Sequence, residues 1–224
     1  MNTLQHPQNP RRCRICLVRH GETRWNAERR LQGHLDVPLN EVGLGQAEAT
    51  ARSLQGGRFA AIYASDLTRA LQTAAPAARD LGLETQPSAA LRERHYGLFQ
   101  GLTYDEAAER HPDAYARFRA REATFAFPDG GESLADFAAR IGAALKALAH
   151  RHLGEQILVV THGGVLDIAH RLASKLPLEA PRDFPILNAA LNWLEYDGDG
   201  PDWHLVAWGV QDHLASARDE LPNA

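Results

Sequence analysis

The chain contains 224 residues, of which 44% are hydrophobic and 23% charged, and its formal net charge at pH 7 is −4. This length and composition fit a single α/β domain with one core better than two small domains. The acidic balance and the lack of a long basic run argue against nucleic acid as a partner, although a local cluster of arginines can still bind a small anion.

Residues 1–12 are polar and lack the apolar segment of a signal peptide. No stretch of the chain approaches the roughly 20 apolar residues that a membrane helix needs. We therefore expect a flexible tail over 1–12, a single domain over 13–224, a cytoplasmic location and no membrane contact. Nothing in the sequence fixes the oligomeric state, and a dimer is one option.

Cys13 and Cys16 are spaced as C-x-x-C. A zinc site would need a second pair of ligands, and a redox motif would need a helix start that lowers the pKa of a thiol. A separation of three residues in a strand places the two side chains on opposite faces, which disfavours a disulfide. We interpret both cysteines as ordinary strand residues.

An apolar run, 15–18, ends abruptly in Arg19, His20 and Gly21. This pattern predicts a buried strand that delivers a cation and an imidazole to its carboxyl end, where open α/β sheets bind ligands. The polar stretch 24–36 lies just past that strand end, which makes it a candidate binding loop.

Helices and short apolar strands alternate between residues 40 and 87. Ser65 is expected to cap a helix with Asp66 in its first turn. Pro87 marks an edge strand, because proline cannot donate a hydrogen bond to a β-ladder. The expected elements are a helix from Asn40 to Gly56, a strand at 59–64, a helix from Ser65 to Gly82 and an edge strand at 83–87.

The next part of the chain, 91–104, is irregular and punctuated by glycines. Thr103 then caps a helix through Arg110, and His111 begins another that reaches about Glu122. These helices are less apolar than core elements. We therefore interpret the insertion 98–127 as a helical lid beside the ligand-binding edge of the sheet.

The C-terminal part repeats the pattern of the first strand, since the apolar run 157–160 ends in Thr161, His162 and Gly163. The alternation of strands and helices predicts a three-layer α/β/α sandwich with a mostly parallel central sheet and one antiparallel edge region. The expected elements are a helix from Ser133 to about Gly154, the histidine strand, a helix from Gly164 to Ser174, and a hairpin of strands 191–196 and 205–208.

Arg19 and Arg69 are the candidate anion-binding cations. Arg19 belongs to a buried strand, where arginine is rarely found without a partner. Arg69 lies in the first turn of its helix, where a bound anion reverses an unfavourable interaction with the helix dipole. An exposed ion pair between Arg69 and Asp66 is the alternative. Two guanidinium groups that face one site suit the oxygens of a phosphate.

His20 and His162 each end an apolar strand, and each precedes a glycine that lets backbone approach a ligand closely. The neighbouring arginines would repel a metal ion, so we expect no metal site. One imidazole is then a neutral nucleophile with its tautomer fixed by a hydrogen bond, and the other a protonated donor to phosphoryl oxygens. Attack on phosphorus would give a phosphohistidine.

The leaving oxygen needs a proton from the lid side, and Glu93 is the preferred donor. Its pKa must be raised, through partial burial and the charge of the approaching phosphate, for the carboxyl group to be protonated near neutrality. The same carboxylate could activate the water that hydrolyses the intermediate. Asp167, on the helix after His162, is a weaker rival.

These residues fall in five ordered blocks that resemble the histidine phosphatase (phosphoglycerate mutase-like) superfamily, from about residue 14 to 208. The resemblance implies that His20 is phosphorylated in a pocket of Arg19, Arg69 and His162, that Glu93 is the proton donor, and that no metal or organic cofactor is needed. It also places Asn26 and Gln32 at the phosphate. The blocks are 17–23, 65–74, 91–97, 131–133 and 160–164, and the substrate-binding candidates are Thr23, Asn26, Gln32, Gly33 and Gly163.

The insertion favours a phosphomonoesterase of the histidine acid phosphatase type over the alternative, a bisphosphoglycerate-dependent phosphoglycerate mutase. The resemblance implies that such mutases hold a second acidic group with paired arginines and a lysine, whereas residues 103–127 contain no lysine and only scattered arginines. A non-catalytic phosphate-binding module is the second alternative, but it would lack a nucleophile or an acid. The partner is a small phosphorylated substrate whose identity the lid does not encode.

Overall fold

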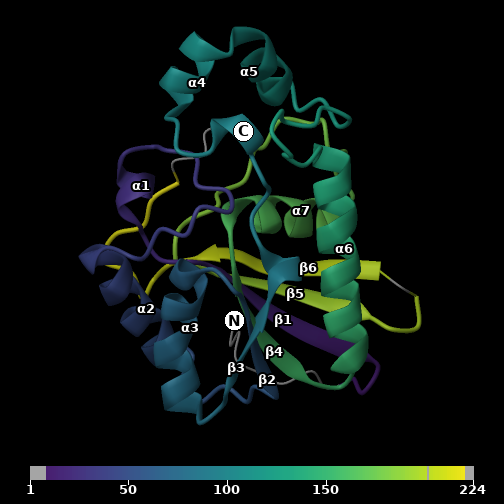
Figure 1. Ribbon diagram of the computed structural model, residues 1–224. Coiled ribbons are helices and arrows are strands. Elements are labelled where there is room, and N and C mark those ends of the chain that lie inside the picture. Colours follow the sequence, from purple (N-terminus) through teal and green to yellow (C-terminus); the bar gives the residue numbers. More distant parts are fainter. Residues whose placement is uncertain (1–8, 201, 220–224) are drawn as a thin grey trace.

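The computed structural model describes residues 9–200 and 202–219, and within them six strands form one sheet in the order β3-β2-β4-β1-β5-β6 (Figure 1). Strands β1 to β4 run parallel, whereas β5 pairs antiparallel with β1, and β6 pairs antiparallel with β5. The strands are β1 (Arg12–Arg19), β2 (Ala61–Ser65), β3 (Thr85–Ser88), β4 (Gln156–Thr161), β5 (Leu191–Asp197) and β6 (Asp202–Val210).

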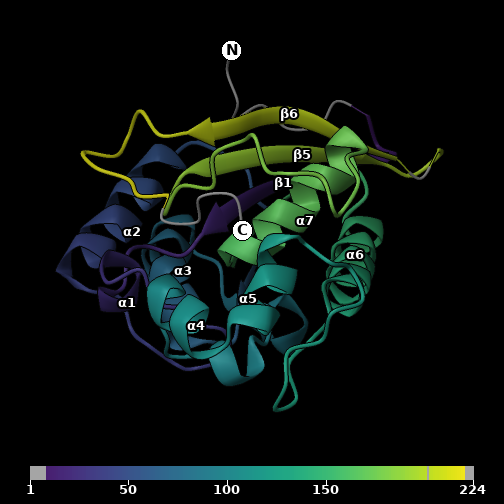
Figure 2. The same cartoon turned by 90° about the horizontal axis from the view of Figure 1, so that it is seen from above.

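Helices cover both faces of the sheet, so the predicted three-layer sandwich is confirmed. Figure 2 shows α2 and α3 on one side of the molecule and α6 and α7 on the other. The helices are α1 (Arg24–Ala27), α2 (Glu41–Ser53), α3 (Thr68–Leu81), α4 (Tyr104–Arg110), α5 (Pro112–Arg119), α6 (Leu134–Arg151) and α7 (Gly163–Ser174).

Side chains of β1 alternate between two hydrophobic cores, as the period of a strand requires. Ile15 and Leu17 pack with residues of α6 and α7, whereas Val18 packs with residues of α2 and α3. Cys13 belongs to the first core and Cys16 to the second, and both thiols are free and buried. The interpretation of the two cysteines as strand residues is therefore confirmed.

The start of α3 differs from the prediction, because the helix begins at Thr68 rather than just after Ser65. Asp36 supplies the cap from a distant loop: its carboxylate accepts hydrogen bonds from the Thr68 backbone N–H and hydroxyl, both at 2.7 Å. Asp66 lies outside the helix and pairs with Arg92 at 2.7 Å. The expected Ser65 cap and the alternative Arg69–Asp66 pair were both wrong, since long-range partners took these roles.

The lid contains α4 and α5 and lies beyond the carboxyl ends of the parallel strands (Figure 1). Both helices begin at the residues predicted, with Thr103 capping α4 and Pro112 in the first turn of α5. The lid has its own aromatic core, which explains how a polar insertion stays folded. This core includes Tyr96, Phe99, Tyr104, Phe118, Phe125 and Phe127.

The predicted terminal hairpin is present, but its second strand is longer than expected and begins at Asp202. No structure was predicted for the segment that follows this strand. There Arg218 donates to the Glu22 carboxylate at 2.5 Å, and its carbonyl accepts from the Asn188 N–H. Residues 1–8 of the predicted tail lie outside the described range, and β1 begins at Arg12. Within the described part of the chain, no helix is long and apolar enough to cross a membrane.

Candidate active site

The two strand-end histidines meet at the carboxyl edge of the sheet. β1 and β4 pair in register with Arg19 opposite Thr161, and the His20 N–H continues this ladder to the Thr161 carbonyl at 2.8 Å. The next residues, His20 and His162, therefore emerge side by side. Their ring centroids are 5.2 Å apart with an interplanar angle of 62°. The predicted convergence of the two imidazoles is what the fold produces.

The His20 ring is held in one tautomer. Its Nδ1–H donates to the Gly21 carbonyl at 2.8 Å, because a carbonyl oxygen can only accept, and Nε2 keeps its lone pair. Gly21 is needed for this arrangement, since a Cβ there would lie 2.6 Å from the Gly43 carbonyl oxygen. Burial, followed by the charges of Arg69 and Arg19, lowers the pKa of His20 well below its usual value. The ring is therefore neutral, as a nucleophile must be.

Arg19 and Arg69 are both buried, and backbone carbonyls orient them. Arg19 Nη1 donates to the Ile186 carbonyl at 2.8 Å. Arg69 donates to the Leu35 and Gly33 carbonyls at 2.9 and 2.7 Å. Burial lowers the pKa of Arg69 to about 10, which still leaves it charged at neutral pH. A backbone carbonyl carries no net charge, so these contacts orient the guanidinium groups without neutralising them.

His162 precedes α7 as its N-cap residue, and its side chain is fully buried. Within the described residues, neither ring nitrogen has a hydrogen-bond partner. Burial and then the charge of Arg69 lower the pKa of His162 well below its usual value. This shift favours a neutral ring, whereas a protonated donor to a bound phosphate was expected from the sequence. A neutral imidazole can still donate one N–H to a phosphoryl oxygen.

Glu93 reaches the same site from the irregular segment after β3. Its two carboxylate oxygens accept from the Arg94 and Gly164 N–H groups at 2.8 and 2.9 Å. Burial raises the pKa of Glu93, whereas these hydrogen bonds and the charges of the site arginines lower it, and the net shift is upward. Gly164 was not among the predicted site residues. This position requires a glycine, because a Cβ there would overlap Glu93 Oε1.

Asp167 has a different environment from Glu93. It forms buried ion pairs with Arg121 at 2.6 Å and with Arg171 at 3.1 Å. Guanidinium groups occupy both Asp167 oxygens, so this carboxyl group is tied to Arg121 and Arg171. The geometry therefore favours Glu93 over its rival.

A cavity at this edge of the sheet has His20 in its wall. Thr23 does not line it; its hydroxyl and N–H both bond to Asn26, whose placement it fixes. Arg30, Leu31, Tyr96 and Tyr104 also line the cavity and carried no sequence signal of their own. The predicted residues that line it are Arg19, His20, Asn26, Gln32, Gly33, Arg69 and Glu93.

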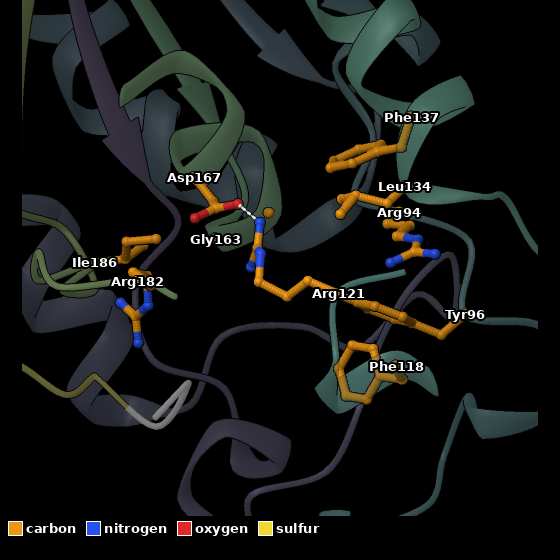
Figure 3. A pocket seen from close by; sticks show the side chains of 11 residues that line it. Arg94, Tyr96, Phe118, Arg121, Leu134, Phe137, Gly163, Asp167, Arg182 and Ile186 are labelled. Carbon is orange, nitrogen blue, oxygen red and sulfur yellow. Dashed lines mark hydrogen bonds and ion pairs between the residues drawn. The ribbon is translucent and has the colours of Figure 1, made fainter. Parts of the chain in front are cut away.

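A second cavity shares Tyr96 with the first and has the predicted residue Gly163 in its wall, whereas His162 lines neither cavity. Figure 3 shows Arg121 reaching from the lid to Asp167, with Arg182 and Ile186 opposite Phe118 and Tyr96. The walls of the second cavity combine aromatic and aliphatic side chains with charged side chains whose net charge is positive. The charged lining residues are Arg94, Arg121, Asp167 and Arg182.

Neither cavity offers a cluster of metal ligands; among the described residues, no group of three or more His, Cys, Asp or Glu side chains could hold a metal ion. The functional groups of the site are instead imidazoles, guanidinium groups and one carboxyl group. This set matches the chemistry of a tetrahedral anion.

The histidine phosphatase superfamily (branch 1) model matches residues 15–211, so the chain belongs to this superfamily. The chain is 42% identical to phosphoglycerate mutase-like protein 4 of Arabidopsis thaliana over 203 residues, which cover 89% of this chain and 86% of the relative. It is 41% identical to the Arabidopsis thaliana metal-independent phosphoserine phosphatase over 204 residues, covering 90% and 83% of the two chains.

Solved structures agree. Bacillus stearothermophilus YhfR superimposes with a TM-score of 0.82 at 33% identity, covering 90% of this chain and 99% of that one. The mycobacterial glucosyl-3-phosphoglycerate phosphatase gives a TM-score of 0.75, also at 33% identity, and covers 90% and 100% of the two chains. The expected family and fold are confirmed.

Proposed function

We propose that this protein is a phosphoric monoester hydrolase of the histidine acid phosphatase type that acts on a small phosphorylated metabolite. The observation that carries the proposal is the His20 ring. It is buried and neutral, is fixed by an Nδ1–H bond to the Gly21 carbonyl, and lies beside two arginines and a second histidine. A nucleophilic imidazole must be neutral, whereas a histidine with only a structural role would not require two arginines beside it.

In the first step, the Nε2 lone pair of His20 attacks phosphorus and the bond to the leaving oxygen breaks. Negative charge is shared by the three remaining phosphoryl oxygens, which Arg19, Arg69 and the N–H of His162 stabilise. Arg19 and Arg69 are fixed in advance by carbonyls, so little reorganisation accompanies the reaction. Asn26 and Gln32 contribute further polar groups at the wall of the same cavity.

Glu93 supplies the proton that the leaving oxygen takes up. Its raised pKa keeps the carboxyl group available as an acid, and its contacts with the Arg94 and Gly164 N–H groups hold it at the site. In the second step, water attacks the phosphohistidine, the P–N bond breaks, and the Glu93 carboxylate takes the proton of that water. Inorganic phosphate leaves, and both side chains return to their starting states.

The second cavity is the proposed place of the leaving group, because Tyr96 lines both cavities and Gly164, in the wall of the second, donates to Glu93, in the wall of the first. Its positive lining favours a leaving group that carries a carboxylate. The relatives named for their substrates, phosphoserine phosphatase and glucosyl-3-phosphoglycerate phosphatase, act on esters of this class. We therefore propose phosphorylated hydroxy or amino acids as the first substrates to try.

One observation supports the mutase alternative. Arg94, Arg121 and Arg182 come from three separate parts of the chain and line one cavity, so a second anionic group could be held there although no paired motif is visible in the lid. The discriminating property is the acceptor of the phosphoryl group. A phosphatase gives it to water, whereas a mutase protects it and returns it to a bound phosphoglycerate.

The test is release of inorganic phosphate from phosphoserine, 3-phosphoglycerate and 4-nitrophenyl phosphate, in the presence of a chelator, beside a mutase assay with and without bisphosphoglycerate. Phosphate release without added metal supports the proposal. Isomerisation of phosphoglycerate that outpaces phosphate release would establish the mutase instead. No turnover in either assay would favour a non-catalytic module.

A further inference from the structure

The segment that carries Glu93 has little regular structure of its own. After the short turn Ala89–Leu91, residues 92–96 form neither helix nor strand. Its backbone carbonyls would otherwise depend on solvent, and an acid on such a segment would be poorly placed. Side chains from several parts of the chain fix it. The His34 ring donates to the Glu93 carbonyl at 2.8 Å, the Thr161 hydroxyl donates to the Leu91 carbonyl at 2.8 Å, and Arg140 of α6 reaches several backbone carbonyls.

Arg140 on α6 binds this segment at three successive points of the backbone. Nη1 donates to the carbonyls of Ala90 and Arg92 at 3.1 and 3.0 Å, and Nη2 donates to the carbonyl of Glu93 at 3.2 Å. The planar guanidinium group can make these contacts together, whereas a lysine ammonium group cannot span them. The Arg140 side chain also lies over the ring of Phe137, 5.1 Å from its centroid.

Glu132 holds the other side of the same guanidinium group. Arg140 Nε and Nη2 donate to the two Glu132 oxygens at 2.8 and 2.7 Å. Glu132 Oε2 also accepts from the His95 N–H at 2.9 Å, and the Glu132 N–H donates to the His95 carbonyl at 2.9 Å. The Arg140–Glu132 pair therefore holds the backbone on both sides of Glu93. Because the two side chains carry opposite charges, the pair has no net charge.

The position of Glu93 has little tolerance. Its carboxylate bridges the Arg94 and Gly164 N–H groups, and it lies so close to residue 164 that a Cβ there would overlap Glu93 Oε1. A small shift of the backbone would lengthen one of these hydrogen bonds and move the carboxyl group away from the leaving oxygen. Errors of about 1 Å can lower a rate by about 100-fold.

We propose that Arg140, held by Glu132, is a positioning residue for the Glu93 proton donor. The proposal rests on the proposed phosphatase chemistry, but it concerns residues that touch neither the phosphate nor the leaving group. The polar contacts of Arg140 described above are with backbone carbonyls and with Glu132, and its guanidinium group also lies over the Phe137 ring. Its effect should therefore appear only where proton donation limits the reaction.

The experiment compares kcat/KM for phenyl phosphate, whose leaving group needs a proton, with kcat/KM for 4-nitrophenyl phosphate, whose leaving group barely does. Arg140→Lys should lower the ratio of the two values by about 10-fold, a fraction of the total general-acid contribution. Glu132→Gln should act in the same direction. In the background of Glu93→Gln, Arg140→Lys should cause no further loss of the ratio, because both changes act on one proton transfer.

Arg79→Lys is the matched control. Arg79 also makes a two-pronged contact with a glutamate, Glu48, but this pair is exposed and joins α3 to α2. It should leave the ratio unchanged. Thermal unfolding of each variant separates loss of folded protein from loss of rate, and Glu132→Gln provides a second route if the Arg140 variant does not fold.

The positioning role would be overturned if Arg140→Lys and Glu132→Gln both left the ratio of the two kcat/KM values unchanged, whether or not the values themselves fell. Failure of the proposed function has a different signature. In that case the wild type shows no metal-free hydrolysis, or Glu93→Gln itself has no effect that depends on the leaving group.

Discussion

The Gly164 N–H donates to the Glu93 carboxylate at 2.9 Å, joining the segment after β3 to the first turn of the helix that follows His162. The proton donor and the phosphate site are thereby fixed to each other, although 71 residues separate the two partners. Helix N-termini favour negative charge, so this contact also opposes the effect of burial on the pKa of Glu93.

Replacing Gly164 by alanine should impair catalysis more than stability. A Cβ would overlap Glu93 Oε1, which must then move away from the leaving oxygen. We expect kcat for phenyl phosphate to fall by about 100-fold. Gly45→Ala in α2 is the control, because a Cβ there meets nothing within 4 Å. Equal, small effects of the two substitutions on kcat would contradict the tight fit around Glu93.

The pH dependence of kcat/KM for phenyl phosphate should reflect the raised pKa of Glu93. The acid acts in its protonated form, so the rate should fall as pH rises through a pKa above the usual 4.5. Glu93→Gln should remove this limb. The lowered pKa of His20 keeps the nucleophile neutral, so no loss of activity should appear on acidification near its usual value of 6.5. A rate that falls through 4.5 would show an unshifted carboxyl group.

Stability should fall as the pH drops through 6.5. The pKa of His162 is lowered in the folded protein, so the unfolded chain binds its proton first, and the stabilisation present at higher pH is lost on acidification. In urea titrations, His162→Asn should flatten this dependence by up to about 1.4 kcal/mol per pH unit. The same change at His204, which is exposed, should leave the slope as it is.

Asp36→Ala should destabilise the protein by about 1 kcal/mol, the usual value of a helix cap. The Asp36 carboxylate accepts two hydrogen bonds from Thr68, and its loop carries the Gly33 and Leu35 carbonyls that orient Arg69. Ser65→Ala provides the comparison, because the Ser65 hydroxyl makes only a 3.4 Å contact with the Leu67 N–H. If Ser65→Ala costs more than Asp36→Ala, the cap has been assigned to the wrong residue.

Arg121→Met should lower kcat/KM for phosphoserine more than for phenyl phosphate, since Arg121 lines the proposed leaving-group cavity. Arg117→Met, on the same lid but exposed and paired with Glu122, should affect neither substrate. Discrimination is measured as the ratio of the two kcat/KM values. An unchanged ratio in the Arg121 variant would remove the cavity from substrate recognition.

Much of the site was predictable from two short patterns, because an apolar run that ends in His-Gly predicts a buried strand with a histidine at its carboxyl end. Strand pairing then does the rest: once β1 and β4 lie in register, His20 and His162 must be neighbours. Glu93 was found through the lid and the family resemblance, and the structure adds the reason for its raised pKa.

Contacts between distant segments could not be predicted from local patterns. The Asp36 cap on α3 replaced a local serine, and Thr23 proved to hold Asn26 rather than line the cavity. Arg182 gave no signal at all, because it lies in an irregular segment and reaches its cavity only through the tertiary fold. Periodicity describes which face of an element is buried, but not which loop supplies its caps and partners.

The most direct test of the account is to trap the intermediate. Protein mixed briefly with phosphorus-labelled substrate and quenched in alkali should carry one acid-labile phosphate, which peptide mapping places on Nε2 of His20. His20→Ala should carry none, and Glu93→Gln should still be labelled by 4-nitrophenyl phosphate. Label on another residue, or rapid turnover by the His20→Ala protein, would contradict the central claim.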